Sequence, residues 1–152
     1  MKKIYIFISI IVIVFILLIA LVRINNKTEN ISIKTFEFIE SDGMTNNDYS
    51  KYTVECNDRC NVTIKKKREK DVIEYEISKE SIKELENIII KYNVYKWNGF
   101  NKDKNVPDSS SFTLNIKLEN NKNIKAHGGM EYPNNYRLVK EEINSYFNNL
   151  IK

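Results

Sequence analysis

The strongest pattern in the chain is an uninterrupted apolar run near its N-terminus. Residues 4–22 read IYIFISIIVIVFILLIALV, without a charged residue, a Gly or a Pro. As a helix with a rise of about 1.5 Å per residue, the run would extend roughly 28 Å, close to the ~30 Å hydrocarbon core of a bilayer. We therefore predict a transmembrane helix over 4–22, with a short tail at 1–3 and a polar linker at 23–30.

A cleaved signal peptide is the main alternative to a retained anchor. The apolar region of such a peptide usually covers about 7–15 residues and ends at small residues in an A-x-A-like pattern. The run here is longer, and Ala20 lies between Ile19 and Leu21. We therefore expect a signal anchor that stays in the chain.

The orientation depends on the residues on either side of the run. Positive residues are nearly balanced, with Lys2 and Lys3 before the run and Arg23 and Lys27 after it, so the positive-inside rule discriminates weakly. A two-lysine tail followed by a long apolar run is nevertheless typical of an uncleaved signal. We expect a single-pass protein of the cell membrane, with a cytoplasmic tail at 1–3 and the C-terminal domain outside.

Beyond residue 30, apolar positions alternate with polar ones, which indicates strands with one buried face. Residues 31–40 change parity between Ile33 and Phe36, and a bulge near Lys34–Thr35 would reconcile the two halves. Residues 41–50 have the composition of a loop.

Residues 51–65 contain the clearest local unit, a hairpin whose loop is Asn57–Arg59. One register places similar residues opposite each other on both faces. It pairs Cys56 with Cys60, Val54 with Val62, Tyr52 with Ile64, and Thr53 with Thr63. A further alternating strand follows over 73–77.

Two later segments have the period of an amphipathic helix. The first begins after Ser78, a potential cap, and ends near Asn93, and the second covers 135–150. Their apolar faces consist of Ile82, Leu85, Ile88, Ile89 and Tyr92, and of Tyr136, Val139, Ile143, Tyr146, Phe147 and Leu150.

Between the helices, residues 97–110 read as irregular and residues 112–118 alternate cleanly. The returning strand is expected to set Leu118 against Ile124, Ile116 against Ala126, and Leu114 against Gly128. The order β-β-β-β-α-β-β-α over 31–152 predicts an α+β domain, a mostly antiparallel sheet with both amphipathic helices on one face.

The charge distribution argues against nucleic acid as a partner. The formal charge of the chain is +4, but Lys2, Lys3 and Arg23 contribute three of its 24 basic residues, whereas all 20 acidic residues lie beyond Arg23. The domain is therefore nearly neutral, and we expect no nucleic-acid binding.

Basic side chains gather in one short stretch of the domain. This basic patch consists of Lys65, Lys66, Lys67, Arg68 and Lys70. A tether to the membrane would let it contact anionic headgroups or cell-wall polyanions. The alternative is a solvated hairpin turn.

The two cysteines, Cys56 and Cys60, are opposite neighbours in the expected hairpin. In an extracytoplasmic domain they would form a cross-strand disulfide, with Cα atoms about 4.4–6.8 Å apart. Free buried thiols are one alternative. A redox or metal pair is another, although a zinc site needs about four ligands and the chain has a single histidine.

No catalytic constellation is visible, and we expect neither an enzyme nor a bound cofactor or metal. His127 falls on the polar face of its strand, beside Asn115, and no nucleophile motif accompanies it. Asn101, Asp103 and Asn105 have the oxygen spacing that begins a calcium loop. The glycine and the final glutamate that such a loop requires are missing.

Four aromatic residues lie in or beside the glycine-containing loops: Trp97, Phe100, Tyr132 and Tyr136. Aromatic side chains on loops are typical of binding surfaces. The alternative is that Trp97 and Phe100 fill the core below the first helix. We place the candidate binding site between the two loops that carry these residues.

Three short motifs follow one another along the chain: W-N-G-F at 97–100, S-F-T-L at 111–114, and G-G-x-x-Y-P-x-x-Y at 128–136. In these motifs the chain resembles small exported or membrane-anchored proteins of unknown function from low-G+C Gram-positive bacteria. The resemblance implies a bacterial, extracytoplasmic domain. It brings no activity and no catalytic residue.

The sequence thus predicts a membrane-tethered, non-catalytic extracytoplasmic domain that binds an unknown protein or cell-wall partner at the cell surface. An envelope hydrolase or transferase with an unrecognised site is one alternative. An accessory subunit of a membrane complex, in which the anchor helix itself makes contacts, is another.

Overall fold

The computed structural model describes residues 31–43, 49–104, 106 and 109–151. The predicted tail, transmembrane helix and linker therefore lie outside the described residues. Within the described part of the chain, no helix has the length and apolar character needed to cross a membrane. Residues from Ile31 onward form one compact unit.

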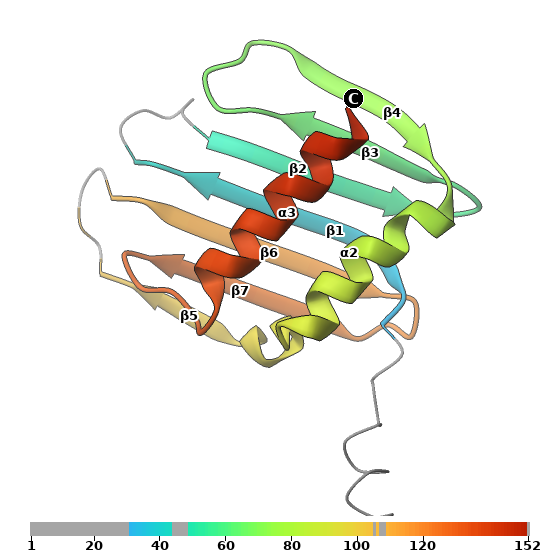
Figure 1. Cartoon of the computed structure of the whole chain (residues 1–152). Helices are drawn as coiled ribbons and strands as arrows, with labels where there is room; N and C mark the ends of the chain where they lie inside the picture. The colour runs from blue at the N-terminus through green and yellow to red at the C-terminus, as the bar shows by residue number, and fades with distance from the viewer. Residues whose placement is uncertain (1–30, 44–48, 105, 107–108, 152) are drawn as a thin grey trace, which may run out of the picture. The chain divides into compact units, whose positions relative to one another are not determined.

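The compact unit is built on one twisted sheet of seven strands (Figure 1). The strands are β1 (Ile33–Ser41), β2 (Tyr49–Cys56), β3 (Cys60–Lys65), β4 (Val72–Ile77), β5 (Phe100–Asp103), β6 (Ser111–Leu118) and β7 (Asn123–Gly129). Their spatial order is β4-β3-β2-β1-β6-β7-β5. Neighbouring strands are antiparallel except β5 and β7, which are parallel.

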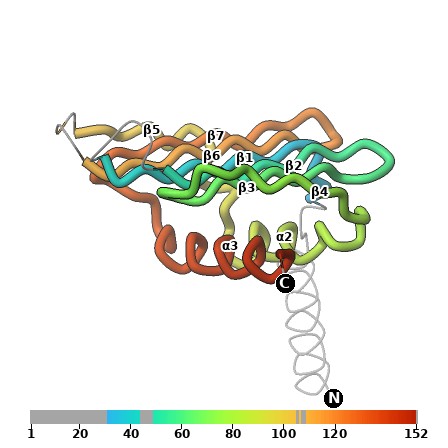
Figure 2. Tube along the Cα trace, turned by 90° about the horizontal axis from the view of Figure 1, so that it is seen from above, coloured from blue at the N-terminus to red at the C-terminus, as the bar shows by residue number. Residues whose placement is uncertain are grey.

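Two α-helices cover one face of the sheet, side by side (Figure 2). They are α2 (Lys79–Lys91) and α3 (Tyr136–Leu150), and a short 3-10 helix, η1 (Val94–Trp97), follows α2. The side chain of Ser78 accepts a hydrogen bond from the backbone N–H of Ser81 and so caps α2 as predicted. The α+β class and the mostly antiparallel sheet expected from the sequence are confirmed.

The hydrophobic core lies between the sheet and the two helices. The Phe147 ring of α3 stacks on Tyr52 of β2, with centroids 4.6 Å apart, and lies 5.9 Å from Phe36 of β1. The buried Tyr146 hydroxyl donates a hydrogen bond to the carbonyl oxygen of Ser81 at 3.0 Å. These contacts hold α3 to both the sheet and the start of α2.

The hairpin of β2 and β3 and the bulge in β1 are as the sequence predicts. The register of β2 and β3 sets Cys56 against Cys60, and Thr53 against Thr63. The register between β1 and β6 shifts between Ile33 and Thr35, which is the expected bulge. Alternation on both faces of a strand therefore carried enough information here to fix the pairing.

Cys56 and Cys60 form the predicted disulfide, with an S–S length of 2.05 Å. Their Cα atoms lie 4.1 Å apart, slightly below the expected 4.4–6.8 Å range. Directly opposite residues of antiparallel strands come as close as about 4.5 Å. The tight loop, closed by a 2.9 Å hydrogen bond from the N–H of Asn57 to the carbonyl of Arg59, accompanies the still shorter separation.

Reducing this disulfide should lower the free energy of unfolding by about 2 kcal/mol, because the bond closes only a short loop in the unfolded chain. Urea unfolding of the full chain in a neutral detergent, with and without reductant, measures the difference. A variant with both cysteines replaced by alanine is the control, since its stability should not respond to reductant. A loss above about 4 kcal/mol would mean that the bond holds more than its own hairpin.

The segment 97–110, expected to be irregular, contains the additional strand β5. Its sequence, FNKD, has one apolar residue and no alternation, and it joins the sheet edge through parallel backbone pairing with β7. The predicted order therefore lacked one strand, because backbone pairing at an edge leaves no hydrophobic pattern.

The predicted register between β6 and β7 was wrong by two residues. The structure pairs Ile116 with Ile124, and Leu114 with Ala126. The strands turn one residue earlier than expected because Asn121 adopts a left-handed conformation, with φ of 63°. A hydrogen bond from the N–H of Leu118 to the carbonyl of Lys122 closes the turn at 2.9 Å. A shift of two residues keeps every side chain on its predicted face.

Candidate functional site

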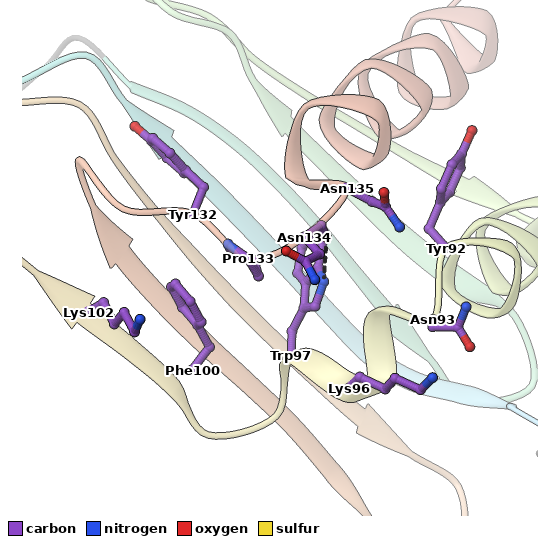
Figure 3. A pocket seen from close by; sticks show the side chains of 10 residues that line it. All are labelled: Tyr92, Asn93, Lys96, Trp97, Phe100, Lys102, Tyr132, Pro133, Asn134 and Asn135. Carbon is purple, nitrogen blue, oxygen red and sulfur yellow. Dashed lines mark hydrogen bonds between the residues drawn. The ribbon is translucent and has the colours of Figure 1, made fainter.

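An open pocket of about 470 Å³ lies where two loop segments meet at the β5 edge of the helix-covered face (Figure 3). One segment runs from the end of α2 through η1 into β5, and the other joins β7 to α3. The lining consists of Tyr92, Asn93, Lys96, Trp97, Phe100, Lys102, Tyr132, Pro133, Asn134 and Asn135. The volume falls within the range of about 300–1,000 Å³ that is usual for small-ligand sites.

Trp97 forms the buried floor of the pocket. After α2, Asn93 takes a left-handed conformation, with φ of 54°, and the chain turns into η1. The Trp97 side chain is only 4% exposed, and its Nε1–H donates a hydrogen bond to the carbonyl oxygen of Asn134 at 3.1 Å. This bond ties the two loop segments together, so Trp97 fills core space, as the alternative reading expected, and also lines the site.

Phe100 and Lys102 reach the pocket from β5. Parallel pairing sets Phe100 beside Ala126 and Lys102 beside Gly128, so both side chains lie on the helix-covered face. The turn before β5 is fixed by a 2.9 Å hydrogen bond from the N–H of Gly99 to the carbonyl of Lys125. The edge strand that the sequence did not reveal is therefore the element that positions one wall of the site.

Tyr132 comes from the loop between β7 and α3 and is 39% exposed. Its ring stacks on Tyr136 with a centroid distance of 4.5 Å, and its hydroxyl lies 2.7 Å from the Ser110 Oγ. In the same loop, Met130 has a positive φ of 58°, and its N–H donates to the carbonyl of Ser110 at 3.1 Å. Ser110 thus holds the loop at two points.

Tyr136, the fourth predicted binding residue, belongs to the core and does not line the pocket. It packs against Phe112 with a centroid distance of 4.6 Å, and its hydroxyl is buried. Burial raises the pKa of Tyr136 well above its usual value, and the nearby Glu40 carboxylate adds to the effect. Its role is to support Tyr132 from beneath.

The pocket is electropositive. Two lysines line it, and none of its ten lining residues is acidic. Glu131 lies 3.6 Å from Lys102 and 3.6 Å from Lys104, so one carboxylate is shared between two ammonium groups. Lys96 is exposed and forms no ion pair with any described residue. A ligand with negative charge is therefore favoured over a cationic one.

The basic patch lies elsewhere, at the turn between β3 and β4. The Lys65 ammonium stands 3.8 Å from the centre of the Tyr49 ring, and Lys67 forms an ion pair with Asp42. Arg68 has a positive φ of 64° at the turn. Two side chains of the basic patch thus contact other residues of the domain, and none of the patch residues lines the pocket.

His127 points to the uncovered face of the sheet, away from the pocket. Its Nδ1 lies 3.1 Å from Thr113 Oγ1, and its Nε2 lies 3.7 Å from Asp103 Oδ2. The expected neighbour Asn115 pairs with Lys125 instead, because of the register shift. Within the described residues, no group of three or more histidine, cysteine, aspartate or glutamate side chains is arranged to hold a metal ion.

The sequence reasoning found the aromatic part of this site and missed its polar part. Lys96, Lys102 and the asparagines 93, 134 and 135 carry no motif, and they meet only because η1 and β5 turn towards the β7–α3 loop. The run Pro133–Asn135 before the last helix was the one available signal. In comparisons with known proteins, the chain matches no protein-family model and no curated protein.

Proposed function

We propose that this chain is a membrane-tethered, non-catalytic extracytoplasmic domain that binds a partner at the cell surface through the pocket beside Trp97. The tether is the apolar run at 4–22, which has the length and composition of a single transmembrane helix retained as a signal anchor. The linker 23–30 joins it to the α+β domain. The bacterial source and the relation to small exported proteins belong to the same proposal.

The observation that carries the proposal is the lining of the pocket. Three of the four aromatic residues predicted from the loops, Trp97, Phe100 and Tyr132, meet there with lysine and asparagine side chains. Hydrolytic sites that act by general acid and base chemistry most often use a histidine or carboxylates. The lining contains neither, and rigid aromatic side chains with polar neighbours are typical of binding sites.

Photocrosslinking on intact cells tests the proposal. A photoreactive amino acid placed at Met130, which is 48% exposed and lies two residues before the pocket-lining Tyr132, should give a crosslinked product with a surface component. The matched control is Val72, which is 50% exposed on β4 at the other edge of the sheet. Equal products from both positions, or none from Met130, would contradict binding at the pocket.

The location is checked in the same cells. Protease added after removal of the cell wall should degrade the domain, because the proposal places it outside the membrane. Full protection would overturn the orientation while leaving the binding role to be judged by the crosslinks. N-terminal sequencing of the mature protein should start before Ile4, and a start beyond Ala20 would overturn the anchor.

A further inference from the structure

We propose that the ligand of this pocket is a saccharide that carries an anionic group. The inference rests on the proposed function in taking the pocket as the binding site, and it adds the chemical class of the ligand. Three features of the lining carry it: its charge, its amide groups and its aromatic rings.

The two lysines of the lining lie on opposite sides of Trp97. Figure 3 shows Lys102 beside Phe100, and Lys96 beyond Trp97 on the side of Asn93. Lys96 lies 5.9 Å from the centre of the Tyr95 ring and has no ion pair among the described residues, so its charge is available to a ligand. Lys102 already lies 3.6 Å from Glu131, so Lys96 is the main group that favours an anionic ligand. Charge-assisted hydrogen bonds to a carboxylate or phosphate are about twice as strong as neutral ones.

The asparagine side chains add neutral hydrogen-bonding groups to the lining. The side chains of Asn134 and Asn135 form no hydrogen bond with any residue in the described ranges. The Asn93 Oδ1 accepts a 2.5 Å hydrogen bond from the Tyr95 hydroxyl, which fixes that amide. Each amide is both a donor and an acceptor, as a hydroxyl group is, so a lining with several amides suits a ligand with several hydroxyl groups.

Phe100 and Tyr132 are partly exposed and offer ring surface to a ligand, whereas Trp97 is only 4% exposed and closes the floor of the pocket. The Trp97 Nε1–H is used by Asn134, and the Tyr132 hydroxyl is used by Ser110. Phe100 has no polar atom. A sugar ring has an apolar C–H surface and polar edges, so it matches ring surface flanked by amides. An acidic peptide would use the lysines and would leave this surface without a matching partner.

Tryptophan fluorescence and calorimetry of the full chain in a neutral detergent test the inference. Trp97 is the single tryptophan of the chain, so its emission reports on this pocket. The probes are trigalacturonate, the same trisaccharide with its carboxylates reduced to alcohols, and triglutamate. Trigalacturonate should change the emission and bind with a Kd about tenfold lower than either of the other two.

Lys96→Met separates the site charge from general charge. It should raise the Kd for trigalacturonate about fivefold to tenfold without changing the unfolding transition, because Lys96 is exposed. The control Lys117→Met removes another exposed lysine, from the uncovered face of the sheet, and should leave the Kd unchanged.

Three results would overturn the inference: equal binding of triglutamate, equal binding of the neutral trisaccharide, or no binding of trigalacturonate. Each is distinguishable from failure of the proposed function. Crosslinking from Met130 in cells together with a failure to bind trigalacturonate would refute the ligand class alone. Binding of trigalacturonate without that crosslink would instead refute the role at the cell surface.

Discussion

Ile143→Asp should abolish cooperative folding of the domain. Ile143 lies on the inner face of α3 and is fully buried. Removing a buried isoleucine side chain costs about 2–5 kcal/mol, and a buried carboxylate without a partner adds several more. Because a domain of this size is stable by only about 5–15 kcal/mol, the variant should lose its unfolding transition and its near-ultraviolet circular dichroism.

Two controls separate burial from helix chemistry. Ile143→Val keeps the side chain apolar and should cost only about 0.5–1.5 kcal/mol. Leu138→Asp introduces the same carboxylate on the same helix, at a side chain that is 43% exposed, and should leave the transition nearly unchanged. Loss of folding in Leu138→Asp as well would mean that α3 tolerates no aspartate, and would remove the argument from burial.

The elements that could be predicted from the sequence are those whose side chains carry a pattern on both faces. In the hairpin of β2 and β3, a one-residue slip would separate Cys56 from Cys60 and would put Val54 on the wrong face. The helices were predictable because α3 repeats its apolar face over four turns. The register of β6 and β7 was not, because a slip of two residues preserves both faces and only the left-handed Asn121 decides between them.

The candidate site could be predicted only in part for a similar reason. Trp97, Phe100 and Tyr132 are recognisable because aromatic residues in loops are unusual. The position of Lys102 depends on β5, whose backbone pairing has no signature in side chains. Lys96 has no distinguishing sequence pattern, and only the path of η1 places it in the lining of the pocket. The path of the backbone determines which residues meet in a site built from two loops. The hydrophobic pattern of the sequence mainly predicts which faces of strands and helices are buried.

Gly128→Ala should disrupt both the pocket and the packing beneath it. A Cβ atom at Gly128 would lie 2.2 Å from the carbonyl oxygen of Glu131 and 2.6 Å from the Phe112 ring. The carbonyl belongs to the backbone of the loop that carries Tyr132, so relief of the clash requires that loop to move. We expect a loss of about 3 kcal/mol in the free energy of unfolding, at the upper end of the cost of overpacking.

Gly99→Ala is the matched control for this substitution. Gly99 has open space around the position of a Cβ atom, and its positive φ of 82° makes an alanine there cost about 1–2 kcal/mol through backbone strain alone. Movement of the Tyr132 loop strains the hydrogen bond from Trp97 to Asn134. Gly128→Ala should therefore shift the Trp97 emission and weaken binding of trigalacturonate, and its loss of stability should exceed that of Gly99→Ala, which meets no steric clash. An unaltered emission in Gly128→Ala, with unaltered stability, would mean that the loop does not lie against Gly128 and that the pocket is shaped differently.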